Sequence, residues 1–366
     1  MERPARWLLI MMCMCLLGGC ASHISLGNRL SHPTAVQAWT PRDSAALFER
    51  LPQHTGTVIT PEQVRLFWRA FPAGDYRFES HYRSADGRSE FGFSVAGLPA
   101  DPNTFPAVPA RDTVLLLHGW GMESSSMLPW ALFLAQHDYR TITVDLRNHG
   151  RSSRAPMGYG MREARDVNAL ISQLRAQGEI TGSLHVLGVS YGAATALFAA
   201  ALQPGQIDGV ISIASFDNAA DAIRGMVPAI RDTPASGLRQ ALTRRWMQWR
   251  YGQVDVDAAI DDASRRLHLD LEQVDTTQAI ASASSCVLLV HGARDSWIAP
   301  RQAEHLHAAS PRSALLMLPE DDHISAPLRL DLLAEPLLAW LSATPPRGQP
   351  CPTPLLAPIS VTGSTS

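Results

Sequence analysis

From about residue 110 onwards, the chain alternates between short continuous apolar runs and longer stretches whose apolar residues recur at helical spacing. The continuous runs predict strands at residues 113–117, 141–144, 184–187, 210–213, 287–290 and 314–318. The stretches between them predict helices at residues 127–137, 161–177, 191–202, 301–309 and 328–342. Strands without polar alternation are typical of a parallel sheet, because helices cover both of its faces. The pattern therefore predicts a doubly wound α/β domain.

Two shorter patterns precede this alternation. Residues 77–83 and 88–95 alternate apolar and polar positions around Ala85-Asp86-Gly87, which predicts a β-hairpin. Thr60-Pro61-Glu62-Gln63 offers a capping threonine, a proline at the first helical position and a glutamine at the third, which predicts the start of a helix. A further short helix is expected near residues 44–51.

About seventy residues without any strand pattern separate the run at 210–213 from the run at 287–290. Helical spacing is visible there at residues 219–226, 237–251 and 257–269. An insertion of this length after a strand predicts a lid, at about residues 217–283. In its middle helix, Trp246 and Trp249 share a face and four arginines lie among them. Those tryptophans either pack on the core or line an acyl pocket, with the arginines at lipid headgroups.

The N-terminus carries a targeting pattern. Arg3 and Arg6 precede an apolar run at residues 7–17, which as a helix is about 16 Å long and too short for a bilayer core of about 30 Å. The run ends in Leu17-Gly18-Gly19-Cys20, which resembles the lipobox of bacterial lipoproteins. This resemblance implies a signal peptide at residues 1–19 and acyl chains on Cys20, with a signal peptide cut elsewhere as the alternative.

Location and segment boundaries follow from this resemblance. Alanine rather than aspartate follows Cys20, so the resemblance implies the outer membrane of the cell envelope, facing the periplasm, over the inner membrane. Residues 20–58 are expected to be a tether and N-terminal segment, 59–343 the folded domain, and 344–366 a disordered, proline-rich tail. Cys286 and Cys351 remain in the processed chain, and an exported compartment permits either a disulfide or two free thiols.

Composition narrows the class of protein. The chain has 366 residues, a hydrophobic share of 46% and a net charge of −3, so it can bury a large core. Nucleic-acid binders are strongly basic, and this chain is not. All 31 basic residues are arginines, which excludes a P-loop and Schiff-base chemistry. A serine nucleophile in this chain must therefore use histidine, since no lysine is present to act as its base.

A nucleophile motif lies between a predicted strand and a predicted helix. Gly188-Val189-Ser190-Tyr191-Gly192 fits G-x-S-x-G, whose glycines allow a tight turn that exposes the Ser190 hydroxyl. Because a serine needs a base, we expect His323, which follows the last predicted strand. Asp295 follows the strand before it and is expected to orient that histidine. The backbone N–H groups of Tyr191 and Trp120 are expected to form an oxyanion hole.

Other titratable residues have less specific interpretations. Asp217 follows the strand at 210–213 and is the alternative acid; Asp321 and Asp322 are expected to be solvated or to adjust the surroundings of His323. Glu163 and Asp166 are expected to be surface or structural groups. The remaining candidates are histidines that precede glycine at strand ends, interpreted as turn-forming residues rather than a metal site: His118, His149 and His291.

Four landmarks, taken in order, resemble those of the α/β-hydrolase superfamily. They are Leu115-Leu116-Leu117-His118-Gly119, the segment from Asp145 to Ser152, the Ser190 motif, and His291-Gly292-x-x-Asp295. The resemblance covers about residues 75–342 and implies an eight-stranded, mostly parallel sheet, acyl-enzyme chemistry, no metal and no cofactor. A serine at the Ser190 position differs from the aspartate of dehalogenases and epoxide hydrolases.

Together these features predict a serine hydrolase, lipase-like, that cleaves carboxylic esters of small molecules or lipids through an acyl-enzyme. Thioesterase, amidase or peptidase and acyltransferase activities on the same three residues remain open. A catalytically silent, membrane-tethered binding protein is the alternative of a different class. Reaction of Ser190 with a fluorophosphonate separates that alternative from the enzymes.

Overall fold

A single large sheet forms the centre of the protein. The computed structural model describes residues 25–32, 44–85, 88–232, 242, 245, 254–345 and 349–354. The strand order is β1-β2-β6-β5-β7-β8-β9-β10, parallel from β6 to β10 and antiparallel at β1 and β2. The expected eight-stranded, mostly parallel sheet is confirmed. Its strands are β1 (His54–Ile59), β2 (Arg65–Phe71), β5 (Asp112–Leu117), β6 (Tyr139–Asp145), β7 (Leu184–Val189), β8 (Gly209–Ile213), β9 (Cys286–Gly292) and β10 (Ser313–Leu318).

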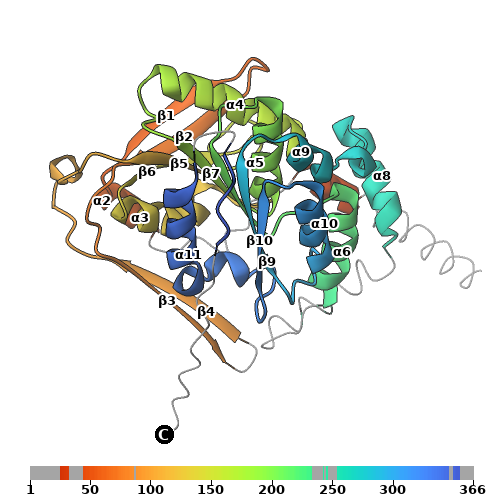
Figure 1. Cartoon of the computed structure of the whole chain (residues 1–366). Helices are drawn as coiled ribbons and strands as arrows, with labels where there is room; N and C mark the ends of the chain where they lie inside the picture. The colour runs from red at the N-terminus through yellow and green to blue at the C-terminus, as the bar shows by residue number, and fades with distance from the viewer. Residues whose placement is uncertain are drawn as a thin grey trace, which may run out of the picture.

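Helices cover both faces of this sheet (Figure 1). One buried cluster joins Val114 and Leu116 to α3 (Leu128–Gln136) and α11 (Leu330–Ala343). The other joins Leu115 and Leu117 to the helices of the opposite face, α4 (Met161–Ala176), α5 (Tyr191–Leu202), α9 (Thr276–Ser282) and α10 (Pro300–Ala309). Alternate residues of β5 are thus buried on opposite faces, which explains why the strand is a continuous apolar run. Each such leucine contributes about 1.5–3 kcal/mol.

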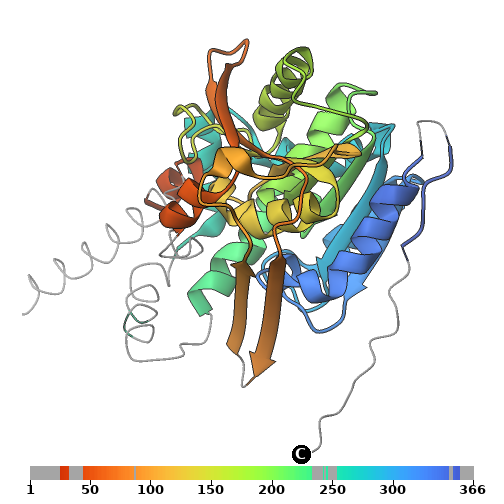
Figure 2. The same cartoon turned by 90° about the vertical axis from the view of Figure 1, so that its left-hand side faces the viewer.

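The predicted hairpin is present but stands apart from the main sheet. β3 (Phe78–Ala85) pairs with β4 (Arg88–Val95) as a separate two-stranded sheet that extends from the body (Figure 2). Phe91 and Phe93 pack against the cluster that contains α11. The short helix α2 (Ser44–Arg50) contributes Leu47 and Phe48 to the same cluster.

The helix predicted to start at Thr60 is wrong, because these residues form the turn between β1 and β2. The Thr60 N–H donates to the Val64 carbonyl at 2.9 Å, and the Thr60 hydroxyl oxygen accepts from the Val64 N–H at 3.2 Å. Gln63 has a left-handed φ of 60°. The capping pattern therefore closes a turn instead, since β2 pairs with β6 and stays extended. The sheet also begins at His54, ahead of the expected start of the domain.

The insertion between β8 and β9 is helical in its described residues. It contains α6 (Ala219–Asp232), α8 (Val256–Leu267), the short helix η4 (Leu271–Gln273) and α9. The predicted helix at 237–251 lies outside the described residues except for Leu242 and Arg245. Three further short helices are η2 (Pro102–Thr104), η3 (Ser124–Met127) and η5 (Ala326–Leu328). Among the helices described, none is both long and apolar enough to cross a bilayer.

A disulfide ties the C-terminal segment to the sheet. Cys286, the first residue of β9, is bonded to Cys351 with a Cα–Cα distance of 5.5 Å. The Arg312 guanidinium also donates to the Gln349 carbonyl at 3.3 Å. Residues 349–354 of the predicted disordered tail therefore have a defined place on the protein, because the covalent bond holds them at β9.

Candidate active site

Ser190 occupies a strained turn between β7 and α5. Its φ of 53° and ψ of −111° are unusual for a residue with a side chain. A Cβ on Gly188 would lie 2.3 Å from the Gly192 carbonyl oxygen, and one on Gly192 would lie 2.3 Å from that of Leu117. Both flanking glycines are thus required by close backbone approach. The Ser190 N–H donates to the Ile213 carbonyl at 2.8 Å, which fixes the turn against β8.

His323 lies between Ser190 and Asp295. Its Nδ1 is 2.7 Å from Asp295 Oδ2, and its Nε2 is 3.0 Å from Ser190 Oγ. A carboxylate accepts only, so Nδ1 donates to Asp295 and Nε2 is left to accept from the serine hydroxyl. The indole of Trp297 stacks on the imidazole with centroids 5.1 Å apart, which further fixes the ring.

Asp295 is buried and fully engaged by donors. Its side chain is 0% exposed, and Oδ1 accepts the N–H groups of Trp297 at 2.9 Å and Ile298 at 2.8 Å. Burial by itself raises the pKa of the carboxyl, but hydrogen bonds from His291 and His323 outweigh burial and hold the pKa well below its ordinary value. Asp295 is therefore a fixed negative charge beside His323.

The other candidate acids have different partners. Asp217 lies 2.7 Å from Nδ1 of His305 on α10, so it is paired away from His323. Asp321 is 2% exposed and binds the Arg329 guanidinium, which corrects the expectation that it is solvated. Asp322 accepts the backbone N–H of Ile324 at 3.0 Å and supports the turn that carries His323. Among the carboxylates considered from sequence, the structure brings Asp295 to His323.

Two buried histidines brace the loop that carries Trp120. The Gly121 N–H donates to His149 Nε2 at 3.2 Å, and His149 Nδ1 donates to the Arg147 carbonyl at 2.8 Å. His118 Nε2 accepts from the Leu146 N–H at 3.0 Å and its Nδ1 donates to the Gly119 carbonyl at 2.8 Å.

Both rings need one unprotonated nitrogen to make these contacts. Burial, and then the neighbouring His149, lower the pKa of His118 to about 4, and burial lowers the pKa of His149. Each histidine therefore satisfies nearby backbone groups, as expected from the sequence. Within the described ranges, no group of three or more side chains could hold a metal ion.

A small, partly open apolar pocket adjoins Ser190. Its volume is about 40 Å³. Its lining is Trp120, Tyr159, Ser190, Tyr191, Phe216, Ala222, Ile223, Met226, Trp297, Ile298 and His323. Among the described residues, His323 is the one titratable base in this lining, and no carboxylate or arginine is among them. Met226, on α6, and Trp297 were not identified from the sequence; the position of Trp297 directly after the Asp295 loop is the signal that could have revealed it.

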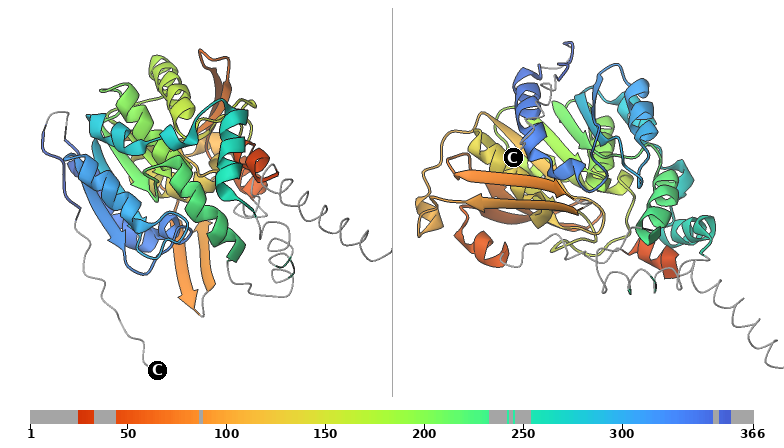
Figure 3. Two further views of the ribbon diagram at one scale, coloured as in Figure 1. Left: turned by 90° about the vertical axis from the view of Figure 1, so that its right-hand side faces the viewer. Right: turned by 90° about the horizontal axis from the view of Figure 1, so that it is seen from below.

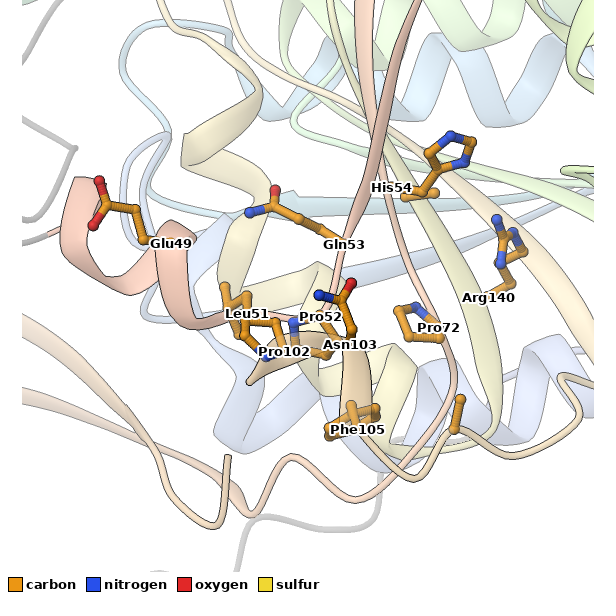
Figure 4. A pocket seen from close by; sticks show the side chains of 12 residues that line it. Glu49, Leu51, Pro52, Gln53, His54, Pro72, Pro102, Asn103, Phe105 and Arg140 are labelled. Carbon is orange, nitrogen blue, oxygen red and sulfur yellow. The ribbon is translucent and has the colours of Figure 1, made fainter. Parts of the chain in front are cut away.

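A larger open hollow of about 470 Å³ lies elsewhere (Figure 4). Gln53, His54 and Arg140 line it, beside Pro72 and Phe105. Arg140 belongs to the amino end of β6, whereas Ser190 follows the carboxyl end of β7, so the hollow opens at the opposite edge of the sheet. No serine or cysteine is among the described residues that line it, so they offer no nucleophile for ester cleavage.

A cluster of buried charged residues lies beside the pocket, and the sequence did not predict their burial. Glu163 and Asp166 are 0% and 1% exposed, so the surface interpretation is wrong. Arg147 Nε donates to Asp166 at 2.6 Å, and Glu163 accepts the Gly160 N–H at 2.8 Å. Burial, with Glu163 nearby, raises the pKa of Tyr191 well above its ordinary value. The cluster joins α4 to the segment after β6 and supports Tyr191, which lines the pocket.

Comparison with known proteins places these observations in context. A model of the alpha/beta hydrolase family matches residues 114–335. A non-heme chloroperoxidase of Streptomyces lividans is 30% identical over 103 residues, which span 28% of this chain and only 36% of that protein. A pimeloyl-acyl-carrier-protein methyl ester esterase of Neisseria meningitidis is 27% identical over 229 residues, 57% of this chain and 86% of the relative. An esterase structure from Pyrococcus furiosus has a similar fold, with a TM-score of 0.55 and 16% identity over 85% of this chain and 94% of its own.

Proposed function

The chain belongs to the alpha/beta hydrolase family and is an esterase-like hydrolase, and we propose that it cleaves carboxylic esters through an acyl-enzyme on Ser190. The observation that carries this proposal is the continuous hydrogen-bonded series from Ser190 through His323 to Asp295, with contacts of 3.0 and 2.7 Å. A serine hydroxyl is a weak nucleophile unless a base lies within hydrogen-bond reach. The contact with His323 Nε2 supplies that base.

Acylation begins when Ser190 Oγ attacks the ester carbonyl carbon and His323 Nε2 takes the hydroxyl proton. The negative charge of Asp295 stabilises the imidazolium. His323 then gives the proton to the leaving alcohol as the carbon–oxygen bond breaks, which leaves the acyl group on Ser190. Water attacks this ester with His323 again as base, the acid leaves, and the serine hydroxyl is restored.

The oxyanion of each tetrahedral intermediate is proposed to lie between the backbone N–H groups of Tyr191 and Trp120. Both residues line the pocket beside Ser190, and the Tyr191 N–H opens α5. One such donor contributes about 3–4 kcal/mol to transition-state stabilisation. The contact between Gly121 and His149 supports this role, because it fixes the peptide that follows Trp120.

The apolar lining favours an uncharged acyl group in the substrate. α6 contributes Ala222, Ile223 and Met226 to this small pocket, so we propose that these side chains limit the length of the acyl group. The same three side chains also suit thioesters, amides and acyl transfer, so these remain second candidates within the enzyme class. The N. meningitidis relative acts, by its name, on a methyl ester, which favours an ester here.

A fluorophosphonate probe tests the enzyme proposal most directly. We expect the folded wild type to be labelled, with Ser190→Ala unlabelled and esterase activity reduced about 10⁴-fold or more. Equal labelling of wild type and Ser190→Ala would remove Ser190 as the nucleophile, and no labelling of the folded wild type would favour a binding protein. In labelled protein, a series of p-nitrophenyl esters from acetate to palmitate then measures the accepted acyl length.

We also propose that the protein is exported and held at the envelope membrane by acyl chains on Cys20, on the outer-membrane side facing the periplasm. The disulfide between Cys286 and Cys351 supports export, because such bonds persist in oxidising compartments. Acyl chains contribute about 0.8 kcal/mol of membrane binding per buried CH₂. We expect Cys20→Ser to release the protein from the membrane fraction; a wild type that is soluble and unacylated by mass spectrometry contradicts this.

A further inference from the structure

The first described residues of the chain pack directly on a wall of the active-site pocket. Residues 25–32, here called the N-terminal segment, form a short helix in which Leu30 and Ser31 are each 1% exposed. The Leu30 carbonyl accepts a hydrogen bond of 2.9 Å from the Tyr159 hydroxyl. Tyr159 lines the same pocket as Ser190, and its ring centroid is 6.1 Å from that of Tyr191.

The N-terminal segment also contacts the insertion, beside α8 (Figure 3). A Cβ on Gly27 would lie 2.3 Å from Oδ2 of Asp262 on α8, so the Asp262 side chain packs directly on the Gly27 backbone. Arg162, at the start of α4, donates to the Leu267 carbonyl at the end of α8 at 2.9 Å. The N-terminal segment, α8 and the Tyr159 loop therefore form one packed unit at the pocket.

Chain length now limits where a lipid on Cys20 can lie. Ser25 follows Cys20 by five residues, which span at most about 18 Å even when fully extended. A domain of about 300 residues has a radius of gyration of about 19 Å and thus a diameter of about 50 Å. A tether much shorter than the domain cannot reach around it, so the face that carries the N-terminal segment must lie nearest the bilayer.

We propose that this arrangement holds the pocket at the membrane surface and that the substrates are esters resident in the membrane. The occupant of this face is a lipid bilayer, and the ester is an amphiphile whose acyl chain passes from the bilayer into the apolar pocket. Transfer between two apolar environments avoids exposing the chain to water. The inference rests on both the esterase and the Cys20 anchor proposed above.

The decisive experiment lengthens the tether. A Gly/Ser linker of about twenty residues between Ala21 and Ser22 is compared with the same linker between Ser360 and Val361, each in acylated full-length protein in vesicles. Rates are measured with p-nitrophenyl palmitate embedded in the vesicles and with p-nitrophenyl acetate in solution. Lengthening a five-residue tether to about twenty-five lowers the effective concentration of the pocket at the membrane about tenfold. We therefore expect the rate of palmitate hydrolysis to fall about tenfold with the N-terminal linker, and the acetate rate to stay unchanged.

A matched pair of substitutions tests the docking itself. Gly27→Leu cannot be accommodated against Asp262, whereas Asn28→Leu changes a neighbouring exposed residue. We expect Gly27→Leu to behave as the lengthened tether does and Asn28→Leu to behave as wild type. In both variants the acetate rate reports whether the active site itself is intact.

The outcomes separate the three proposals. Unchanged palmitate rates with the longer N-terminal linker overturn the membrane-facing pocket while leaving the esterase in place. Absence of acetate hydrolysis in every variant removes the esterase proposal. Unacylated Cys20 in the wild type overturns both the anchor and the present inference, since no short tether then exists.

Discussion

The loops at the carboxyl ends of β7, β9 and β10 differ sharply from the insertion between β8 and β9. At the loops, Asp295 and His323 are almost fully buried, and each nitrogen or oxygen described above has a partner. In the insertion, Arg224 of α6 is 36% exposed at the side chain and pairs with three partly exposed carboxylates, Asp221, Asp257 and Glu272.

The two regions differ in their contribution to the proposed function: the loops carry the proposed catalytic residues, and the insertion lines the pocket. Asp295 and His323 are fixed by burial and hydrogen bonds, and the turn of Ser190 is fixed by flanking glycines that have no room for a Cβ. α6 contributes Ala222, Ile223 and Met226 to the pocket, yet its ion pairs at Arg224 are solvent-exposed. The helix also contains Pro228, which donates no helical hydrogen bond. If the proposed function holds, the first region carries the chemistry and we expect substitutions in the second to change the accepted acyl group with little loss of stability.

The largest expected effect comes from removing the negative charge of the buried Asp295. Asp295→Asn removes the negative charge and offers His323 Nδ1 the wrong partner, so we expect kcat to fall about 10⁴-fold. Asp217→Asn is the matched control and should leave kcat unchanged, because Asp217 contacts His305. The measurement is steady-state hydrolysis of p-nitrophenyl butyrate, with circular dichroism to verify folding. A larger loss from Asp217→Asn would transfer the acid role to that residue.

The second prediction addresses the brace of the oxyanion loop. His149→Leu deletes the acceptor for the Gly121 N–H, so the peptide that follows Trp120 loses its fixed orientation and the loop that carries the Trp120 N–H is loosened. We expect kcat to fall about 10²-fold with KM little changed, as for loss of an oxyanion donor. His149→Gln, which keeps an acceptor at similar reach, should recover most of the rate. Equal losses in kcat and in thermal stability for both variants would indicate a packing role alone.

The sequence predicts the alternation of strands and helices because residues such as Leu115 and Leu116 are buried on opposite faces and leave a continuous apolar run. It also predicts Ser190, Asp295 and His323 as neighbours, since each follows a strand and parallel strands bring these ends together. The structure brings the three side chains into hydrogen-bond contact, and the experiments above test their catalytic roles.

What the sequence could not predict depends on contacts distant in the chain. Thr60 to Gln63 carries a capping pattern that suits a helix or a turn, and pairing of β2 with β6 decides for the turn. Glu163 and Asp166 are acidic and were expected at the surface or in structural roles, but the buried Arg147 draws Asp166 inward. The pairing of Cys286 with Cys351 depends on where the C-terminal segment returns to the sheet.

The third prediction is that the protein loses stability in acid because the buried His118, which follows β5, becomes protonated. The folded-state pKa of His118 is about 4, because of burial, against 6.5 for the exposed ring, so the unfolded state binds more protons between these values. Stability contributed by neutral His118 is thus complete above pH 6.5 and declines as the pH falls toward 4. At pH 4.5 we expect a loss of about 2.5 kcal/mol, measured by urea unfolding. A flatter profile in His118→Gln would support this assignment, and an identical profile would contradict it.

The smallest expected effect lies in the insertion. Arg224→Gln removes all three ion pairs of α6, but exposed pairs contribute about 1 kcal/mol or less. We expect a small decrease in melting temperature and an unchanged rate on short esters. A loss as large as that from a buried pair, about 3–5 kcal/mol, would mean that α6 is as firmly fixed as the catalytic loops.

The disulfide places two of the three proposed catalytic residues inside one covalently closed ring of chain. The bond between Cys286 and Cys351 closes a ring of chain with a sequence separation of 65 residues, and both Asp295 and His323 lie inside it. Ser190 lies outside, on the far side of the insertion. A protease cut in the insertion would yield one fragment with the nucleophile and a second, internally cross-linked fragment with the base and acid. In the intact fold these two parts meet through the pairing of β8 with β9, so the covalent ring and the sheet together hold the acid and base against the nucleophile.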